Sequence, residues 1–515
     1  MGQPNPPGTL GRWGAVLRSG AAGLALALLS VPFLWSWLAP LPLALLFHEL
    51  SQAGSRRRAF LLAFVAGLTF FGGHLGWLFV SFTRLFGPVG GLLTLLVVPL
   101  LALSWGLIAF LAFDRSSRQT LLVLPLVWVV GEYARTLGPL AFPWGALGYT
   151  WLPTPLVQAA DLGGWSLLSL VTTGTAAALA AFVRGHRWPL VTLTGVIVVG
   201  TVYGTTRSPL PQPDQTALIV QGAVPPLEKA VKREGAELDV YLDLTRRAWA
   251  AGRVDLVAWP ESASPFPPTD PETLVALTEL RVPLVTGAPT QEGRRYWNSA
   301  YAVEGQVTGR YDKVHPVPFG EFLPWRQALT RVYDPVLGLF GLRHMQGVTP
   351  GTSYRPLSLR QLQVGAYISY ESVFAQAART LTARGARVLA HLSNDAWFEG
   401  TAGKEQHFQM GRLRAIETRR YVLRASNDGI SGVIDPLGQV TVRFPEGTRG
   451  AFRASFGEYT DLTPYVHWGD WPVVLAGLLW GAAVVLGQAS KGRRSTSERR
   501  PQSRANPARA TRQVE

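Results

Sequence analysis

Apolar segments long enough to cross a membrane fill the chain before Arg207, and one more follows its polar part. A membrane-spanning helix needs roughly 20 mostly apolar residues. Eight segments approach this length, the second being short and interrupted by prolines: 19–36, 38–50, 59–82, 88–113, 120–135, 163–183, 188–205 and 471–488. Charged residues make up only 16% of the chain, against roughly 25% in an average soluble domain. The sequence therefore predicts a multi-pass membrane protein.

Arginine and lysine set the expected orientation, because short loops rich in these residues stay in the cytoplasm. They lie before the first segment, in every second loop and after the last segment: Arg12, Arg18, Arg56, Arg57, Arg58, Arg115, Arg118, Arg184, Arg187, Lys491, Arg493 and Arg494. With eight spans, all these clusters fall on one side. Both termini are therefore expected in the cytoplasm and residues 206–470 outside it. The net charge of +15 sits largely in these clusters and in the tail, so nucleic-acid binding is not expected.

Between Asp214 and about Asp461 the pattern changes to short apolar strands that alternate with charged helical stretches. This alternation predicts an α/β sheet covered by helices. Strands are expected at 217–221, 255–259, 282–286, 363–369 and 386–392, and helices at 227–252, 271–280 and 403–420. The expected organisation is a transmembrane bundle of about seven spans (1–206), an extracytoplasmic domain (207–461), a last transmembrane helix with its lead-in (462–490) and a basic, disordered cytoplasmic tail (491–515).

Three expected strand ends carry polar side chains, and the chemistry of such sheets collects where strands end. These side chains are Glu261, then Lys313 with Glu321, and then Ser369 with Tyr370 and Glu371. A carboxylate base, an ammonium group and a hydroxyl nucleophile suffice for acyl transfer. From spacing alone, the competing interpretation is that these charged residues are merely solvated.

The motifs around these residues resemble the nitrilase superfamily, whose members use a Glu–Lys–Cys triad. With the spans attached, nearly the whole chain resembles the bacterial apolipoprotein N-acyltransferases. The resemblance rests on Leu218–Gly222, Trp259–Glu261, Asn298–Ala300, Asp312–Lys313, Pro318–Pro324, Leu392–Phe398, His407–Met410, Arg424–Gly429, Thr463–Tyr465 and Gly469–Pro472. It implies an αββα sandwich attached to a membrane bundle of about eight helices.

The resemblance also implies roles for individual residues. Glu261 would be the general base, Lys313 the oxyanion-stabilising cation and residue 369 the nucleophile. Glu321 matches a second carboxylate near the triad, and Tyr370 and Glu371 match the residues that follow the nucleophile. The implied reaction passes an acyl chain from a glycerophospholipid to the enzyme, and then to the amine of a diacylglyceryl-cysteine apolipoprotein, at the bacterial inner membrane.

No cofactor or metal is expected. His315, His391 and His407 are too dispersed in the sequence to predict a metal site, and hydrogen-bonded structural roles are expected for them.

Residue 369 departs from the family pattern, because it is Ser where the family has Cys, and the chain has no cysteine at all. A serine hydroxyl is far less acidic than a thiol and normally needs a well-placed base. Ser369 is therefore a working nucleophile in a natural variant, an engineered substitution, or the mark of a homologue that lost catalysis. The alternatives to an acyltransferase are a catalytically silent lipid- or lipoprotein-binding protein and a membrane-anchored amidase.

Overall fold

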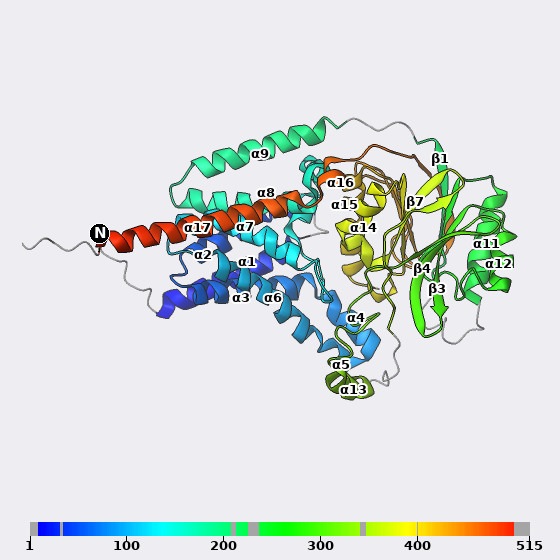
Figure 1. Cartoon of the computed structure of the whole chain (residues 1–515), viewed down its shortest axis with the longest axis horizontal. Helices are drawn as coiled ribbons and strands as arrows, with labels where there is room; N and C mark the ends of the chain where they lie inside the picture. The colour runs from blue at the N-terminus through cyan, green and yellow to red at the C-terminus, as the bar shows by residue number, and fades with distance from the viewer. Residues whose placement is uncertain are drawn as a thin grey trace, which may run out of the picture.

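Apolar helices form one end of the molecule and two stacked β-sheets form the other (Figure 1). The computed structural model describes residues 9–30, 34–207, 213–224, 236–339, 347–398 and 400–498. The bundle consists of α1 (Thr9–Leu28), α2 (Pro40–Ser51), α3 (Arg56–His74), α4 (Trp77–Phe86), α5 (Pro88–Gly91), α6 (Thr94–Ala112), α7 (Ser117–Ala134), α8 (Ala160–Val183), α9 (Trp188–Thr205) and α17 (Trp471–Glu498).

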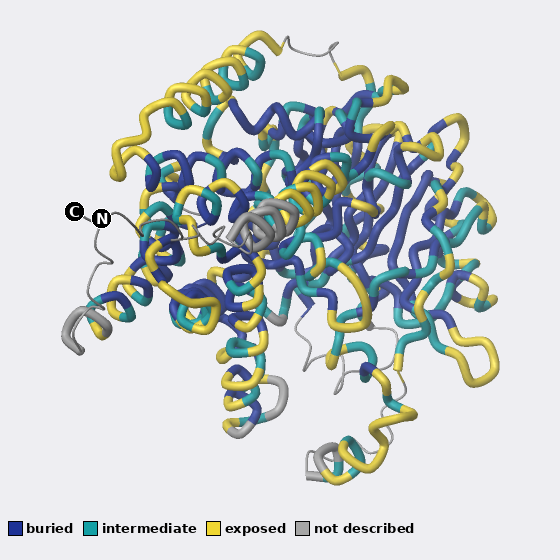
Figure 2. The backbone as a smooth tube through the Cα atoms, turned by 60° about the vertical axis from the view of Figure 1, so that its left-hand side comes forward, coloured by how far each residue is buried: buried dark blue, intermediate teal, exposed yellow. Residues whose placement is uncertain are grey.

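Three helical segments of the described chain are long and apolar enough to cross a membrane by themselves: Thr94–Ala112, Pro155–Val183 and Trp188–Thr205. Helices α3 and α4 together make a fourth candidate, bent by 58° at the break between them. Trp13–Leu28 and Trp471–Gly487 are apolar but shorter. Figure 2 shows α9 as an exposed helix along the edge of the bundle, and none of its residues is buried.

Four of the expected spans differ in their boundaries, and one of them, 88–113, is divided into α5 and α6. The first helix runs from Thr9 to Leu28 instead of 19–36, because Pro32 cannot continue a helix. The expected single span over 59–82 is broken after His74, where Gly72, Gly73 and Gly76 weaken the helix. Helix α17 continues to Glu498, into the expected disordered tail, and 499–515 lie outside the described residues.

The α/β part contains two six-stranded sheets. The first has the order β12-β1-β2-β3-β4-β5 and the second β11-β10-β9-β8-β7-β6. Strands β1, β2 and β3 run parallel, as do β7, β8 and β9. The strands are β1 (Gln215–Gln221), β2 (Leu256–Ala258), β3 (Leu284–Glu292), β4 (Arg295–Val303), β5 (Val307–Asp312), β6 (Leu357–Leu359), β7 (Leu362–Ile368), β8 (Val388–Ser393), β9 (Val422–Ser426), β10 (Gly432–Ile434), β11 (Val440–Arg443) and β12 (Gly450–Phe456).

Each sheet is covered on its outer face by helices, which gives four layers. Side chains alternate along β1: Ala217 and Ile219 enter the core between the sheets, whereas Leu218 and Val220 pack against the outer helices. Those outer helices are α11 (Ala236–Ala250) and α12 (Pro271–Thr278), and α14 (Ala375–Ala383) and α15 (Gly403–Thr418) cover the second sheet. The first part of the expected helix 227–252 lies outside the described residues.

Helices α14, α15 and the short α16 (Pro464–Trp468) lie between the second sheet and the bundle (Figure 1). Met410, Leu413 and Ile416 of α15 belong to the same apolar core as the bundle helices. A fully buried ion pair, Arg414 with Glu417 at 2.9 Å, lies within this junction. Both partners belong to α15, and groups on the bundle side bind them: Arg414 Nη2 donates to Tyr149 Oη (3.1 Å), and the backbone N–H of Trp165 donates to Glu417 Oε1 (3.0 Å). Since a buried charge is costly without its partners, these contacts favour one fixed docking of the sandwich.

Candidate active site

Glu261 lies in the loop directly after β2, at the edge where the parallel strands end. Its Oε1 accepts a hydrogen bond from Asn298 Nδ2 (2.7 Å), and its Oε2 accepts one from the backbone N–H of Asn394 (2.9 Å). This loop presses onto β3 at Gly287, where a Cβ would lie 2.6 Å from the Cα of Glu261. A glycine is therefore required there for the carboxylate to reach its position.

Lys313 follows β5 and lies between two carboxylates. Its Nζ is 2.8 Å from Glu321 Oε1 and 3.5 Å from Glu261 Oε1, and its side chain is 1% exposed. Asn298 Nδ2 bridges the same two oxygens, since it also lies 3.2 Å from Glu321 Oε1. Glu321 Oε2 in turn accepts from the backbone N–H of Val317 (2.6 Å). The structure thus brings together three of the side chains that the sequence singled out.

Ser369 is the first residue after β7 and has the left-handed φ of 50°. This conformation costs a non-glycine residue roughly 1–2 kcal/mol, and such strain concentrates at functional sites. The sequence-predicted strand 363–369 therefore ends one residue early, and the serine stands on a sharp turn instead of within the strand. No described residue forms a hydrogen bond with its hydroxyl.

Two buried histidines lie beneath this turn. His391 Nε2 lies 3.0 Å and His407 Nε2 3.2 Å from the carbonyl oxygen of Ser369. Arg424 Nη1 contacts His391 Nδ1 (2.7 Å); an arginine can only donate, so Nδ1 accepts and Nε2–H donates to Ser369. His407 Nδ1 lies between Asp395 Oδ1 (3.0 Å), which can only accept, and Arg424 Nη2 (3.2 Å), which can only donate. The hydroxyl of Ser372 lies 2.8 Å from His407 Nε2.

Both histidines are neutral by virtue of their surroundings. Burial, reinforced by the charge of Arg424, holds the pKa of His391 well below its ordinary value. Burial also lowers the pKa of His407, although Asp395 opposes this. The interior position of both rings fits the expected hydrogen-bonded roles, but their convergence on one carbonyl was not predicted.

Glu371 connects the Ser369 turn to the segment after Lys313, and Tyr370 connects it to the bundle side of the molecule. Glu371 accepts hydrogen bonds from Tyr311 Oη (2.6 Å) and from the backbone N–H groups of Val314 (2.7 Å), His315 (3.2 Å) and Ile368 (2.7 Å). It therefore fixes the segment after Lys313 to the Ser369 turn. Tyr370 points away from the carboxylates, and its hydroxyl donates to the carbonyl of Ala141 in the bundle (2.8 Å).

Burial controls the electrostatics of the site. It raises the pKa of Glu261, an effect that Lys313 only partly offsets and that Glu321 reinforces. The two carboxylates outweigh burial at Lys313 and raise the pKa of its ammonium, so Lys313 stays charged. Burial also raises the pKa of Glu371 to about 7. The arrangement offers a strengthened carboxylate base and a permanent cation, and Glu371 links the segment after Lys313 to the strained Ser369 turn. Among the described residues, no three histidines or acidic residues are grouped as metal ligands.

Two family models match the chain, one in the helical bundle and one in the α/β sandwich. Residues 22–178 match the family model of the apolipoprotein N-acyltransferase N-terminal domain, and 219–457 match that of the carbon–nitrogen hydrolases. The apolipoprotein N-acyltransferase of Methylococcus capsulatus is 34% identical over 488 residues, which cover 89% of this chain and 94% of that protein. That of Azotobacter vinelandii is 33% identical over 94% of this chain and 96% of its own length.

The chain belongs to the apolipoprotein N-acyltransferase family. The resemblance seen in the sequence motifs is thereby confirmed, and the sandwich is that of a carbon–nitrogen hydrolase. Members of the family are acyltransferases, so the binding-protein and amidase alternatives lose their main support.

Sequence reasoning missed several residues of this site. Asn298, which bridges the two carboxylates, appeared only as part of a motif. Arg424 likewise appeared only within a motif, and His391 was expected to be hydrogen-bonded, without its partners being predicted. Both stand in strands that are buried throughout. A charged or titratable side chain in a fully buried strand must be paired, and this is the signal that could have revealed the network beneath Ser369.

Proposed function

We propose that this protein transfers an acyl chain from a glycerophospholipid to the N-terminal amine of a diacylglyceryl-cysteine apolipoprotein, through an ester on Ser369. The observation that carries the proposal is the buried Glu261–Lys313–Glu321 cluster. Glu371 ties the segment after Lys313 to the strained Ser369 turn, because it accepts hydrogen bonds from the backbone N–H groups of Val314 and Ile368. Maintaining buried charges and a left-handed serine is costly without a chemical task.

In the first step, Ser369 Oγ attacks the carbonyl carbon of the phospholipid ester while Glu261 takes the hydroxyl proton. The Lys313 ammonium stabilises the oxyanion that forms. The bond from the carbonyl carbon to the glycerol oxygen then breaks, and that oxygen receives the proton from Glu261. The products are a lysophospholipid and an acyl ester on Ser369. The raised pKa of Glu261 makes its carboxylate a stronger base, which suits the poorly acidic hydroxyl.

In the second step, the apolipoprotein amine attacks the Ser369 ester, and Lys313 again stabilises the oxyanion. The nitrogen gives a proton to Glu261, the bond to Ser369 Oγ breaks, and Oγ takes that proton. An amide and a free hydroxyl result. Glu321 and Glu371 act by positioning, the first on Lys313 and the second on the turn.

We also propose that the bundle crosses the bacterial inner membrane eight times, with the sandwich outside the cytoplasm. Helix α1 begins and α17 ends at the end of the bundle farthest from the sandwich (Figure 1), which supports two cytoplasmic termini. The arginine-rich loops support the same orientation. In this arrangement, lipids reach the site sideways from the bilayer, and secreted apolipoproteins reach it from outside.

The proposal is tested by an acyl-transfer assay on the full-length protein in phospholipid vesicles with a diacylglyceryl lipopeptide, followed by mass spectrometry. The native chain should add one acyl chain to the peptide, and Ser369→Ala should add none. If only Ser369→Cys produced the acylated peptide, the serine site would be intact but inactive. If none of the three variants did, the binding-protein alternative would replace the proposal.

A further inference from the structure

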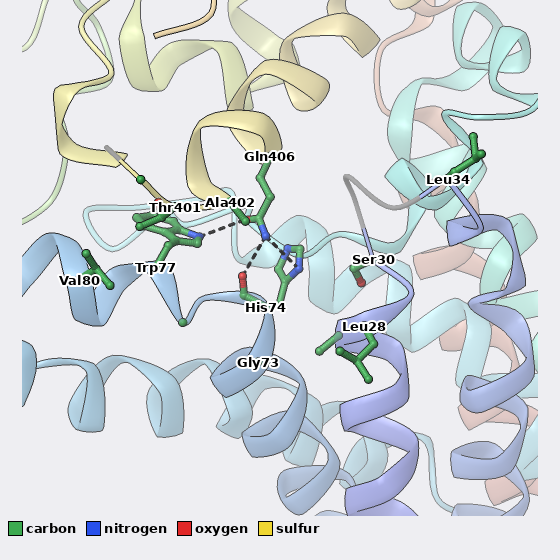
Figure 3. Close-up of a pocket in the computed structure, with 13 residues that line it drawn as sticks. Leu28, Ser30, Leu34, Gly73, His74, Trp77, Val80, Thr401, Ala402 and Gln406 are labelled. Atoms are coloured by element: carbon green, nitrogen blue, oxygen red, sulfur yellow. Dashed lines mark hydrogen bonds between the residues drawn. The ribbon is translucent and has the colours of Figure 1, made fainter. Parts of the chain in front are cut away.

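A cavity whose lining includes neither Ser369 nor the Glu261–Lys313–Glu321 cluster opens between the bundle and the sandwich (Figure 3). Its volume is about 580 Å³, within the roughly 300–1,000 Å³ of ligand pockets. It lies where the last turn of α1 diverges from the bend between α3 and α4, under residues 400–402. Just below, α1 and α3 are in direct contact, since a Cβ at Gly73 would lie 2.9 Å from that of Ala27.

The rim of the cavity is apolar and faces outward. Leu28 is 69% exposed, Leu34 68% and Val80 36%. Leu28 is the last residue of α1, Leu34 lies in the turn before Ser36–Leu38, and Val80 lies in α4. If the bundle crosses the membrane as proposed, the cavity is reached from the leaflet next to the sandwich. Its ligand then comes from the lipids.

The floor of the cavity is buried and polar, and the donor and acceptor of each hydrogen bond to Gln406 can be assigned. Gln406 Oε1 accepts from Trp77 Nε1 (3.0 Å) and Trp144 Nε1 (2.8 Å), and its Nε2 donates to the backbone carbonyl of His74 (3.0 Å). The same Nε2 lies 3.4 Å from His74 Nδ1, so Nδ1 is the accepting nitrogen of that ring. The ring proton of a neutral His74 is therefore on Nε2, to which no described residue forms a hydrogen bond.

The chemistry of the lining selects the part of a lipid that fits. Among the described residues that line the cavity there is no lysine, arginine, aspartate or glutamate, and Arg84 reaches only its rim, 3.7 Å from where a Cβ on Gly400 would lie. A phosphate or other charged headgroup in the interior would therefore remain unpaired. Apolar walls with one free N–H donor suit a fatty-acyl chain with its ester carbonyl.

A layer of aromatic rings separates this cavity from the Ser369 turn. Phe398 lies 4.8 Å from Trp77 on the cavity side and 5.6 Å from His407 on the other, measured between ring centroids. A chain in the cavity is therefore not in position for attack by Ser369. Gln406 in the floor directly precedes His407, which lies beneath the serine.

We propose that this cavity is an accessory lipid site that holds one non-transferred fatty-acyl chain of a glycerolipid, with its ester carbonyl accepting from His74 Nε2–H. The inference rests on the proposed membrane placement, but not on catalysis. A lipid held here would bring glycerolipid to the site between turnovers. It would also brace Gln406, and through it the α15 segment that contains His407.

The test uses Ser369→Ala protein, which cannot form the acyl-enzyme, in phosphatidylglycerol vesicles that contain a diacyl phosphatidylglycerol with a photoreactive group on one chain. Crosslinks should map to α1, α4 and residues 400–402. Filling the cavity with Ala402→Trp should reduce them at least fivefold, and removing the donor with His74→Phe about three- to tenfold. A dialkyl ether analogue of the probe should be insensitive to His74→Phe.

Two controls carry the same substitutions outside the cavity: Val199→Trp on the exposed helix α9, and His186→Phe in the loop before it. Neither should change labelling. Equal labelling of all variants, or crosslinks spread over the outer faces of the bundle, would overturn the inference. Because labelling needs no turnover, the accessory site stands even if the native chain fails to acylate lipopeptide, and that failure would count only against the proposed function.

Discussion

At the scale of single residues, the site depends on Lys313 neutralising two buried carboxylates. Both carboxylates have other partners, but among the described residues only Lys313 provides positive charge within 4 Å of them. Removing one member of a buried charge cluster typically costs about 3–5 kcal/mol, because the remaining charges stay buried without compensation. Catalysis and stability should therefore fail together at this position.

Lys313→Met should abolish acyl transfer and lower the melting temperature of the protein in detergent. The matched control is Lys404→Met, since Lys404 is also buried but its nearest carboxylate oxygens are 3.9 Å away. The control should lose much less stability. Similar melting temperatures for the two variants would argue against a tightly paired cluster around Lys313.

The pH dependence of acyl transfer should report Glu261. The base must be ionised, so the rate falls as pH falls through the pKa of Glu261. Burial raises that pKa above the ordinary 4.5 of a glutamate, so the acidic limb of the rate profile should lie at a correspondingly higher pH. Glu261→Gln should reduce the rate by about 10²–10⁴-fold. A profile that is flat down to pH 4.5 would contradict this role.

Glu261, Lys313 and Glu321 could be predicted because each follows an apolar strand in a recognisable motif. Asn298 could not be singled out in the same way, because its importance arises from bridging carboxylates that are 37 and 23 residues away in sequence. Such a contact depends on how β4 pairs with β3 and β5, which no local pattern specifies.

At the scale of elements, the turn after β7 is held by the strands beneath it. His391 of β8 donates to the Ser369 carbonyl because Arg424 of β9 fixes its tautomer. The sequence predicted strands at 363–369 and 386–392, and Arg424 only as part of a family motif. Its strand at 363–369 wrongly included Ser369. The reason is physical: a serine with positive φ has no sequence signature, since it is maintained by tertiary hydrogen bonds against its own preference.

His391→Leu should therefore slow acyl transfer by roughly a hundredfold, because small displacements of a reacting group are costly. His391→Gln has a side-chain amide with an N–H donor for the Ser369 carbonyl and an oxygen acceptor for Arg424. This variant should therefore keep most of the native rate. Comparing the two rates at equal folded fraction, judged by thermal melting, separates positioning from stability. Equal losses in both variants would mean that the hydrogen bond to Ser369 is unimportant.

At the scale of the whole molecule, hydropathy located most bundle helices, but it did not predict where a helix is broken or shortened. The break at His74 and the short α2 arise from glycines and prolines, which shift helix ends in ways that a hydropathy window averages out. The docking of the sandwich through α15 was not predictable. The docking uses an apolar face of α15, and the sequence of α15 resembles that of any helix that packs inside a soluble domain.

The absence of cysteine makes the topology directly testable. Arg294→Cys, in the exposed turn between β3 and β4, should react with a membrane-impermeant maleimide on intact spheroplasts. Arg57→Cys, at the exposed start of α3, should react only after the membrane is opened. Reaction of both residues in intact spheroplasts would contradict the eight-span arrangement.

The most direct test of the central claim is the intact mass of the protein after incubation with a phospholipid of defined chains and no acceptor. The native chain should gain the mass of one acyl group, located on Ser369 by peptide mapping, and lose it when lipopeptide is added. Ser369→Ala should gain nothing. Acylation that persists in Ser369→Ala, or that does not discharge to the lipopeptide, would contradict an ester on Ser369 as the intermediate.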